Sequence, residues 1–308
     1  MSEITVCIMS LNRPEYLCEA VASALAQTAL PQSIIIFDNG SESSVLDAVN
    51  SYLSKDVRWI GSEVTHSAFW NFQRAIAEAE TEYVLVMHDD DRLCSDFIDK
   101  QVAFLDSNPE VGAVSCNSFL INEQGQRNGR TLRSDFIDAG AELYRCSVDV
   151  ALRYANDSCI PFSSAVFRTK FVRKVALQEE YGKVADAVFF CDLADTCVVA
   201  FQSERLYECR VHPGQDSVSF SPEILNKLEN FLWTRNGVNE ERINLLRNLL
   251  ISQHTFRKLL QIFKALKQSN FPLKEVMELC TVRDRRFSYS DALKIIFNFF
   301  KNKLAGTT

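Results

Sequence analysis

The sequence predicts an α/β fold, in which a mostly parallel open sheet is flanked by helices, followed by a C-terminal α-helical appendage. Short apolar runs alternate with amphipathic stretches over about the first 115 residues, as parallel strands and their connecting helices do. Polar residues follow the ends of three of these runs. From residue 221 onward, helical periodicity continues without a strand candidate. We therefore expect a domain of residues 1–220 and a helical region of residues 221–308.

The first strand is expected at residues 4–10, where ITVCIMS is a continuous apolar run with β-branched residues at its start. Pro14 suits the first position of the helix that follows. Apolar residues then recur at helical spacing, and the buried face of this helix is expected to contain Leu17, Val21, Ala24 and Leu25.

A second strand, SIIIFD at residues 33–38, ends in the turn sequence Asp38-Asn39-Gly40. The next elements are expected to be a helix in SVLDAVNSYL, a strand in VRWIGS, a helix in SAFWNFQRAIAEAE and a strand in EYVLVMH. Ligands of open α/β sheets bind beyond the carboxyl ends of the strands. We expect three polar segments to meet there, namely residues 10–13, 38–41 and 89–91.

The stretch from about residue 115 to 220 is less regular. Strands are expected in VGAVSCNSFLI and ERLYECRVH, a strand or a strand with a helix start in SSAVFRTKFV, and a helix in DAVFFCDLADT. Ser221-Pro222-Glu223 is a favourable helix opening, which places the domain boundary near residue 220.

Composition excludes several classes of protein. With 308 residues, 47% of them hydrophobic and 24% charged, the chain is neither disordered nor fibrous. A net charge of −7 argues against nucleic acid as the main partner, because phosphate backbones need a basic surface. No stretch reaches the roughly 18 apolar residues of a membrane span.

The ten cysteines are scattered singly, without a CxxC pair, and several lie in apolar runs. This pattern favours buried thiols in a reducing compartment over disulfides or zinc ligands. The N-terminus has neither the basic segment nor the apolar core of a signal peptide. We therefore expect a cytoplasmic location.

Three consecutive aspartates, Asp89, Asp90 and Asp91, follow the fourth expected strand. An isolated acidic triplet is often a solvated turn. At the carboxyl end of a buried strand, however, carboxylates are suited to hold a divalent cation such as Mg²⁺ or Mn²⁺ against a substrate diphosphate. The triplet therefore favours a metal site and a phosphate-bearing substrate, with the solvated turn as the alternative.

Six segments in one order resemble the nucleotide-sugar glycosyltransferases of family 2, which have the GT-A fold with a Rossmann-like nucleotide-binding sheet. They are VCIMSLNRPEYLCEAVASALAQ, SIIIFDNGS, NFQRAIAEAETEYVLVMHDDDRL, SSAVFRTKF, DAVFFCDL and ECRVHPGQDS, and they span residues 4–219. The resemblance implies a metal-dependent inverting transferase that uses Mg²⁺ or Mn²⁺ and moves a sugar from a nucleotide sugar to a hydroxyl. A UDP-linked donor is favoured, with a saccharide or lipid-linked saccharide acceptor in bacterial surface polysaccharide synthesis, such as O-antigen or capsule.

The resemblance also assigns nucleotide-binding residues. Asp38 matches the aspartate that accepts from the imide N–H of uracil, although an Asx turn before Asn39-Gly40 is an equal alternative. Many relatives have a tyrosine where this chain has Leu11, so base stacking is expected to be weaker or supplied elsewhere. Asn71 and Arg74 match donor-facing positions, with a solvated helix face as the alternative. The loop beneath the base corresponds to Ser10, Leu11, Asn12 and Arg13.

The triplet matches the DXD region of the family with one departure. Aligned on the following Arg-Leu, the usual first aspartate falls on His88, which favours Asp90 or Asp91 as the metal ligand and places Asp89 near the ribose. All three aspartates stay candidate metal ligands. His88 itself is either part of the site or a satisfied histidine at a strand end. His212 matches an R-x-H element and is a candidate metal ligand or diphosphate donor, with a structural role in a turn as the alternative. Arg210 of the same element is a candidate partner of the phosphates.

Transfer to a hydroxyl needs a general base, because the acceptor oxygen becomes a strong nucleophile only as its proton leaves. The resemblance assigns this role to Asp186 in VADAVFFCDLA, with Asp192 in reserve, although Asp186 also suits a helix N-terminus for structural reasons. Ser163 and Ser164 match the wall between the donor and acceptor sites.

Other functions are less consistent with the sequence. A sugar-phosphate nucleotidyltransferase needs a Gly-rich loop after the first strand, and SLNRPEYL has no glycine. A phosphatase with an aspartyl nucleophile needs DxDx[TV], which is absent. A catalytically inactive nucleotide-sugar-binding or scaffold protein would not need both Asp186 and the triplet.

The last amphipathic segment, DALKIIFNFFKNKLAG, has three possible roles. Its apolar face and nearby lysines suit a helix on a membrane surface, here the inner face of the membrane. They equally suit packing on the catalytic domain or on a second subunit in a homo-oligomer. The residues concerned are Leu293, Ile296, Phe297 and Phe300, with Lys294, Lys301 and Lys303.

Overall fold

The computed structural model describes residues 2–133, 140–155 and 159–212, together with Lys227, residues 230–232, Glu241 and Asn244. The chain divides into two compact units, Met1–Ile243 and Asn244–Thr308, and almost all described residues belong to the first. The expected helical region of residues 221–308, including the segment DALKIIFNFFKNKLAG, lies largely outside the described residues. The expected domain boundary near residue 220 therefore stays a prediction.

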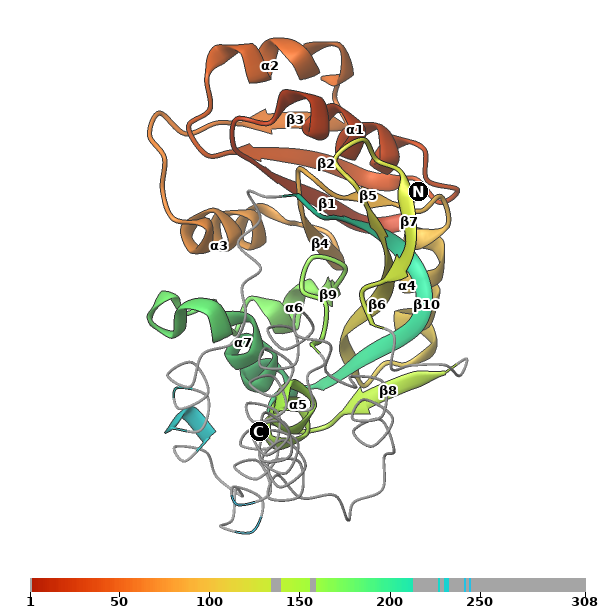
Figure 1. The fold of residues 1–308 in the computed structure, drawn as a ribbon, viewed down its shortest axis with the longest axis vertical. Coiled ribbons are helices and arrows are strands. Elements are labelled where there is room, and N and C mark those ends of the chain that lie inside the picture. The colour runs from red at the N-terminus through yellow and green to blue at the C-terminus, as the bar shows by residue number, and fades with distance from the viewer. Residues whose placement is uncertain are drawn as a thin grey trace, which may run out of the picture. The chain divides into compact units, whose positions relative to one another are not determined.

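A single ten-stranded sheet organises the first unit (Figure 1). Its central path runs β3-β2-β1-β4-β9-β6-β10-β5, with β7 beside β6 and β8 beside β10. The strands are β1 (Ser2–Ser10), β2 (Pro31–Asp38), β3 (Val57–Ile60), β4 (Tyr83–His88), β5 (Arg92–Leu93), β6 (Val111–Ile121), β7 (Arg127–Thr131), β8 (Ala141–Tyr144), β9 (Val166–Arg168) and β10 (Val198–Arg210).

The first four long strands form the parallel sheet that the apolar runs predict. β1 pairs in parallel with both β2 and β4, and β2 pairs in parallel with β3. The alternation of strand and helix is likewise as expected, with helices α1 (Pro14–Leu25), α2 (Ser43–Val49) and α3 (Ala68–Glu78) and the 3₁₀ turn η1 (Asn50–Tyr52). Parallel strands buried on both faces need continuous apolar runs, which is why the sequence shows them so clearly.

The rest of the sheet is mixed. β9 inserts antiparallel between β4 and β6, and β10 runs parallel to β6. The edge pieces β5, β7 and β8 are antiparallel. Neither β7 nor β8 was expected. The sequence of β7, RNGRT, has no apolar side chain, and β8 has only the four residues AELY. The remaining helices are α4 (Phe97–Ser107), α5 (Ser147–Ala155), α6 (Thr169–Val172), η2 (Glu179–Val184) and α7 (Ala185–Ala194).

Helix α1 begins at Pro14, as predicted, and its buried face contains three of the four expected residues together with Ala20. The exception is Leu25, which is 39% exposed. Leu25 is the last residue of the helix. The prediction for Leu25 is therefore wrong, because helical spacing was extended one position too far.

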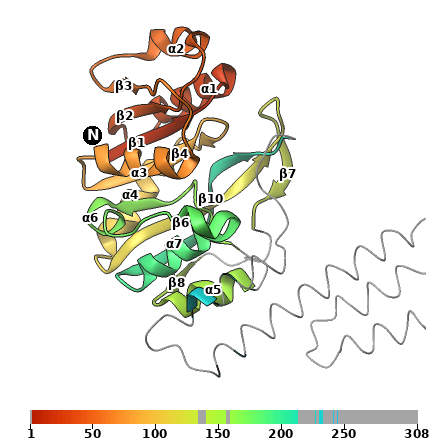
Figure 2. The same ribbon diagram turned by 90° about the vertical axis from the view of Figure 1, so that its left-hand side faces the viewer.

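Helices cover both faces of the parallel strands. Figures 1 and 2 show α1 and α2 on one side of these strands, with α3 and α7 on the other. On the second side a cluster of aromatic rings connects α3, β9 and α7. Phe72 of α3 lies edge-on to Phe189 of α7, with ring centroids 5.6 Å apart. The other members of the cluster are Phe162, Phe167 and Phe190. These contacts fix α7 relative to the parallel strands.

No helix in the described part of the chain is long and apolar enough to cross a membrane.

Candidate active site

The ends of three parallel strands lie side by side, as the sequence predicts. Ser10 at the end of β1 pairs with Asp38 at the end of β2, and Met9 pairs with His88 at the end of β4. The pairing continues into the loop, because Asp89 N donates to Met9 O at 3.1 Å. The turn formed by Asp89, Asp90 and Asp91, the carboxylate turn, therefore lies beside Asp38 and the first loop.

Asp38 is 3% exposed, and its two carboxylate oxygens have different surroundings. Oδ2 accepts from the backbone N–H groups of Gly40 and Ser41, at 3.1 and 3.0 Å, which is an Asx turn. Oδ1 is buried and has no hydrogen-bond partner among the described residues. The Asx-turn alternative is therefore correct for one oxygen, and it leaves the second available to a ligand.

The first loop is held in place at both ends. Leu11 N donates to Asp89 Oδ2 at 3.0 Å, while the Leu11 side chain is 39% exposed. Asn12 has a φ of 53°, which asparagine tolerates, and its N–H donates to Ser41 Oγ at 2.9 Å. Within the described chain, the Ser10 hydroxyl is buried without a hydrogen-bond partner. The backbone of this loop is thus set before any ligand arrives.

Asn71 and Arg74 both hold the end of β2. Asn71 is 3% exposed, donates to Phe37 O at 3.1 Å and accepts from the Arg74 guanidinium at 2.9 Å. Arg74 also donates to Asp38 O at 2.9 Å. The solvated-face alternative is therefore wrong for Asn71, and the pair supports the strand end that bears Asp38.

Asp89 faces the first loop. It is 3% exposed and accepts from Leu11 N and, through Oδ1, from the Arg13 guanidinium at 3.2 Å. Burial raises the pKa of Asp89 to about 6, although both hydrogen bonds favour its ionised form. The residue couples the carboxylate turn to the loop expected beneath the base.

Asp91 faces strand β10. It is 3% exposed, and its oxygens accept from Tyr207 Oη at 3.0 Å and from Arg210 N at 2.9 Å. Burial, and then the negative charge of Asp90, raises the pKa of Asp91 to about 6. Both Asp91 oxygens are thus used in joining the turn to β10.

Asp90 lies between the other two and has a different partner. Its Oδ2 accepts from the Arg13 guanidinium at 3.2 Å and lies 2.9 Å from His212 Nε2. Its Oδ1 accepts no hydrogen bond from the part of the chain that the structure describes. Asp90 is 7% exposed. It is the member of the turn with an oxygen still available, and it faces the second candidate metal ligand, His212.

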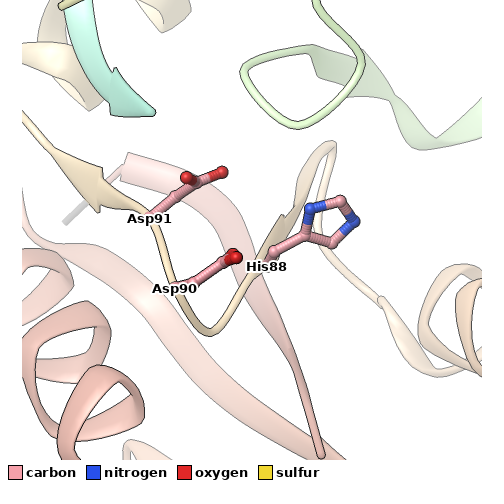
Figure 3. A group of neighbouring side chains, drawn as sticks. All are labelled: His88, Asp90 and Asp91. Atoms are coloured by element: carbon pink, nitrogen blue, oxygen red, sulfur yellow. The ribbon is translucent and has the colours of Figure 1, made fainter. Parts of the chain in front are cut away.

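The carboxylate turn has a geometry that fits a metal ion. One ligand atom from each of His88, Asp90 and Asp91 can be chosen so that all lie within 4.8 Å of one another. Opposite ligands of an octahedral ion, each at about 2.1 Å, are about 4.2 Å apart, so these separations are close to those of a bound ion. Figure 3 shows the two carboxylates and the His88 ring pointing into the same space. The solvated-turn alternative is wrong, because all three aspartates are buried.

Arg210 is fully buried and does not face this space. Its Nε donates to Asp90 O at 2.7 Å, and one terminal nitrogen donates to Glu19 Oε2 at 2.6 Å. The other donates to the carbonyls of Asn122 and Glu123. The guanidinium therefore binds the back of the turn, and it is not placed to meet a phosphate as the resemblance implied.

Asp186 lies in the first turn of α7, on a different element from the other candidates. Its Oδ2 accepts from Tyr154 Oη at 3.2 Å, and its Oδ1 accepts from Ala187 N at 2.8 Å. The residue is partly exposed, and dense packing around the carboxylate raises its pKa to about 6. A carboxylate with such a pKa is suited to take a proton near neutral pH. Asp192, which accepts from Gln178 Nε2 at 3.0 Å, lies six residues further along α7.

The segment around residues 159–164 lies between Asp186 and the carboxylate turn. Tyr154 Oη, whose single hydrogen can be donated to Asp186, also lies 3.3 Å from a second acceptor, Ile160 O. At the other end Ser163 interacts with Tyr207, the partner of Asp91. Among the described residues, the hydrogen bonds of Asp186 go to Tyr154 and Ala187 and not to the turn. Ser164 is fully buried and bonds within the sheet, so it does not form a wall as the resemblance implied.

Sequence patterns did not identify three residues that shape the site. Tyr154 and Tyr207 donate to Asp186 and Asp91, and Glu19 accepts from Arg210. The two tyrosines are buried polar groups, and such groups need a partner, but that signal does not name the partner. Glu19 lies on an amphipathic helix, where a glutamate is ordinary.

The model of "Glycosyl transferase family 2" matches residues 5–176. Among solved structures, the chain is similar to crystal structures of TarS from S. aureus. With TarS 1–349 in complex with UDP-GlcNAc it shares 16% identity and a TM-score of 0.64, over 89% of this chain and 78% of that one. With the complex with UDP the values are 15% and 0.60, over 90% and 78%.

The full TarS structure gives 15% identity and a TM-score of 0.56, over 82% of this chain and 43% of that one. At these identities the likeness to TarS concerns the fold, and it confirms the expected α/β class with an open sheet flanked by helices, as in GT-A glycosyltransferases. The family match spans more than half of the chain and decides against the nucleotidyltransferase and scaffold alternatives. The chain therefore belongs to glycosyl transferase family 2, and it is a nucleotide-sugar glycosyltransferase.

Proposed function

We propose that this glycosyltransferase is a metal-dependent inverting enzyme that takes its sugar from a UDP-linked donor. One observation carries the proposal: a buried carboxylate oxygen without a partner in the described chain, Asp38 Oδ1, lies at the same sheet edge as the carboxylate turn. Leaving a buried acceptor unpaired costs about 1–3 kcal/mol, so a ligand donor is expected there. A uridine diphosphate would supply that donor at one end and phosphates for a metal at the other.

The choice of uridine follows from Asp38. The imide N–H of uracil donates to a carboxylate, whereas the corresponding nitrogen of cytosine is an acceptor and would face Asp38 with its lone pair. The crystal structures of TarS with UDP-GlcNAc and with UDP support the same class of donor. Ser10, Leu11, Asn12 and Arg13 would lie along the nucleoside, and Asn71 would hold the strand end that presents Asp38.

The metal, Mg²⁺ or Mn²⁺, would be held by Asp90 with His212. Asp90 has an oxygen available, and His212 Nε2 is 2.9 Å from its other oxygen. Asp91 and Asp89 would add negative charge around the ion. Asp89, which accepts from Leu11 N, would lie on the ribose side. Both of these carboxylates are buried with a raised pKa, a cost that a bound cation relieves. When bound, the ion would neutralise the departing diphosphate.

Asp186 would act as the general base. Its carboxylate accepts from Tyr154, which fixes its orientation, and its pKa of about 6 leaves it ionised and basic at neutral pH. As Asp186 takes the acceptor proton, the acceptor oxygen attacks the anomeric carbon from the face opposite the diphosphate. A single displacement of this kind inverts the configuration of the sugar.

The acceptor is proposed to be a saccharide or lipid-linked saccharide in bacterial surface polysaccharide synthesis, such as O-antigen or capsule. The support is the family to which the chain belongs, together with its resemblance to enzymes of that process. A cytoplasmic location, peripheral contact with the inner face of the membrane and a homo-oligomer are part of the same proposal. The division into a catalytic domain of residues 1–220 and a helical region of residues 221–308 also belongs to this proposal.

Isothermal titration of the full chain with UDP and CDP, with and without Mn²⁺, tests the proposal. UDP should bind more tightly than CDP, and Mn²⁺ should strengthen UDP binding. Asp38→Ala should weaken UDP binding by about 10- to 150-fold, the value of a hydrogen bond to a charged group, and remove the preference over CDP.

Asp47→Ala is the matched control, because Asp47 is an exposed aspartate on α2. It should bind both nucleotides as the unmodified chain does. Equal binding of UDP and CDP by the unmodified chain would overturn the uridine assignment. Binding of UDP that does not change with Mn²⁺ would overturn the metal site.

A further inference from the structure

His88 is the residue of the site whose role is least explained by folding. It ends β4 with its side chain exposed, and in the described chain its ring has no hydrogen-bond partner. No group of the described chain therefore fixes the His88 ring in place. Its neighbour Met87 is fully buried in the core, so strand alternation turns His88 toward the opposite side.

Asp90 is the common neighbour of two histidines that are far apart in the sequence. A ligand atom of His88 lies within 4.8 Å of ligand atoms of Asp90 and Asp91. His212 Nε2 lies 2.9 Å from Asp90 Oδ2. The His88 ring and the Asp90 and Asp91 carboxylates face the same space in Figure 3. An ion bound between Asp90 and Asp91 would therefore have the His88 imidazole available from the end of β4, while His212 approaches Asp90 Oδ2 from beyond the end of β10.

The charges around this space favour a cation. Three carboxylates are gathered in three consecutive residues, and Arg13 bridges two of them, Asp89 and Asp90. Asp91 receives neutral donors, the Tyr207 hydroxyl and a backbone N–H. Among the described residues, the cations contacting the turn's side chains are Arg13 and, when protonated, His212. The turn thus retains negative charge for a divalent ion to neutralise.

We propose that His88 is a metal ligand beside Asp90 and Asp91, and that its imidazole makes this site selective for a divalent transition metal over Mg²⁺. This inference rests on the proposed metal site and adds the class of ion that the site takes. Mg²⁺ prefers oxygen ligands and keeps several waters, whereas imidazole nitrogen favours Mn²⁺ and, increasingly, the later first-row ions. A site of one imidazole and two carboxylates therefore binds Mn²⁺ more tightly than Mg²⁺, and Co²⁺ more tightly than Mn²⁺.

The first experiment reads the ligand atom directly. Electron spin-echo envelope modulation of Mn²⁺ bound to the full chain reports nitrogen coordinated to the ion. The unmodified chain should show nitrogen coupling, and His88→Ala should reduce it. His66→Ala is the matched control, because His66 is an exposed histidine stacked on Trp70 and should leave the spectrum unchanged.

The second experiment measures selectivity. Titration of the full chain with Mg²⁺, Mn²⁺ and Co²⁺ should give affinities that rise in that order. His88→Asp replaces the imidazole with a carboxylate and should shift the ratio of Mn²⁺ to Mg²⁺ affinity toward Mg²⁺ by about tenfold or more, since even indirect partners of metal ligands are worth about 10- to 100-fold.

The outcomes separate this inference from the proposed function. An unchanged nitrogen signal in His88→Ala, or an affinity ratio that His88→Asp does not move, would overturn the role of His88. Enhancement of UDP binding by Mn²⁺ in those same variants would leave the proposed metal-dependent function intact. Failure of the unmodified chain to bind any of the three ions, with or without UDP, would overturn both.

Discussion

Replacing Asp186 with asparagine should abolish most of the activity and yet stabilise the protein at neutral pH. Asparagine has nearly the same shape and can accept from Tyr154 Oη as the carboxylate does, at 3.2 Å. It has no charge to bury. Because a general base contributes about 10²- to 10⁴-fold to the rate, turnover should fall by that order while donor binding is retained.

The stabilisation can be worked out from the pKa. Packing raises the pKa of Asp186 from 3.8 to about 6, so the folded state binds a proton more tightly than the unfolded state. Stability from this group is complete below the unfolded pKa and is lost as the pH rises through the folded pKa. One pKa unit corresponds to about 1.4 kcal/mol, which gives about 3 kcal/mol at pH 8, and partial exposure of Asp186 reduces this to about 1–3 kcal/mol.

Urea denaturation at pH 5, 6.5 and 8 measures this difference. The free energy of unfolding of Asp186→Asn should exceed that of the unmodified chain, and the excess should grow by about 1 kcal/mol between pH 5 and pH 8. Asp47→Asn, at an exposed position on α2, is the control and should show no such growth. A difference that is constant with pH, or a variant that is less stable at pH 8, would refute the reasoning.

Three further predictions concern the support of the site. Arg210→Met should lower the free energy of unfolding by about 1–3 kcal/mol, because it leaves the buried carbonyl of Asp90 without its donor and the partly exposed Glu19 without its ion-pair partner. Arg58→Met, at an exposed position, should leave the free energy of unfolding unchanged, and equal urea midpoints for the two variants would contradict the assignment. Gly40→Ala should lower the free energy of unfolding by about 1–3 kcal/mol and weaken UDP binding. Gly40 has a φ of +83°, and a Cβ there would lie 2.7 Å from the backbone carbonyl carbon of Val64. An unchanged calorimetric melting temperature and an unchanged UDP affinity would argue against this prediction. Asp90→Asn should lower Mn²⁺ affinity by at least about tenfold. Asp91→Asn should lower Mn²⁺ affinity less than Asp90→Asn does, but it should lower the free energy of unfolding, because the Asp91 oxygens accept hydrogen bonds from β10. If Asp91 were the main ligand, Mn²⁺ titration would show the larger loss of affinity in Asp91→Asn.

The parallel half of the fold is readable from sequence because its signals are local. Continuous apolar runs, Pro14 at a helix start and polar residues at strand ends each depend on a few neighbouring residues. The same rule placed Asp38 and the carboxylate turn at one edge, since the carboxyl ends of parallel strands meet there. Where the pattern is weak, as in β7 with RNGRT, the element was not expected.

The mixed half of the sheet was less predictable. β9 lies between β4 and β6, and this position depends on pairing between strands more than 50 residues apart. Local periodicity gives the type of an element and does not give its neighbour. The exposed position of Leu25 has a related cause. Helical spacing shows that Leu25 belongs to α1, but it does not show whether the core extends to the last residue of the helix.

By itself the sequence determined the order of strands and helices in the first half of the chain, the family resemblance and the candidate residues at the strand ends. Only the tertiary structure decided what those residues contact. It placed His212 beside Asp90, 122 positions away in the sequence. It also bound Arg210 to the backbone of the turn and Asp91 to the backbone of β10. It also left Asp38 Oδ1 buried without a partner in the described chain. The physical reason is that backbone propensity and apolar periodicity act over a few residues, whereas buried polar groups find partners wherever packing brings them together.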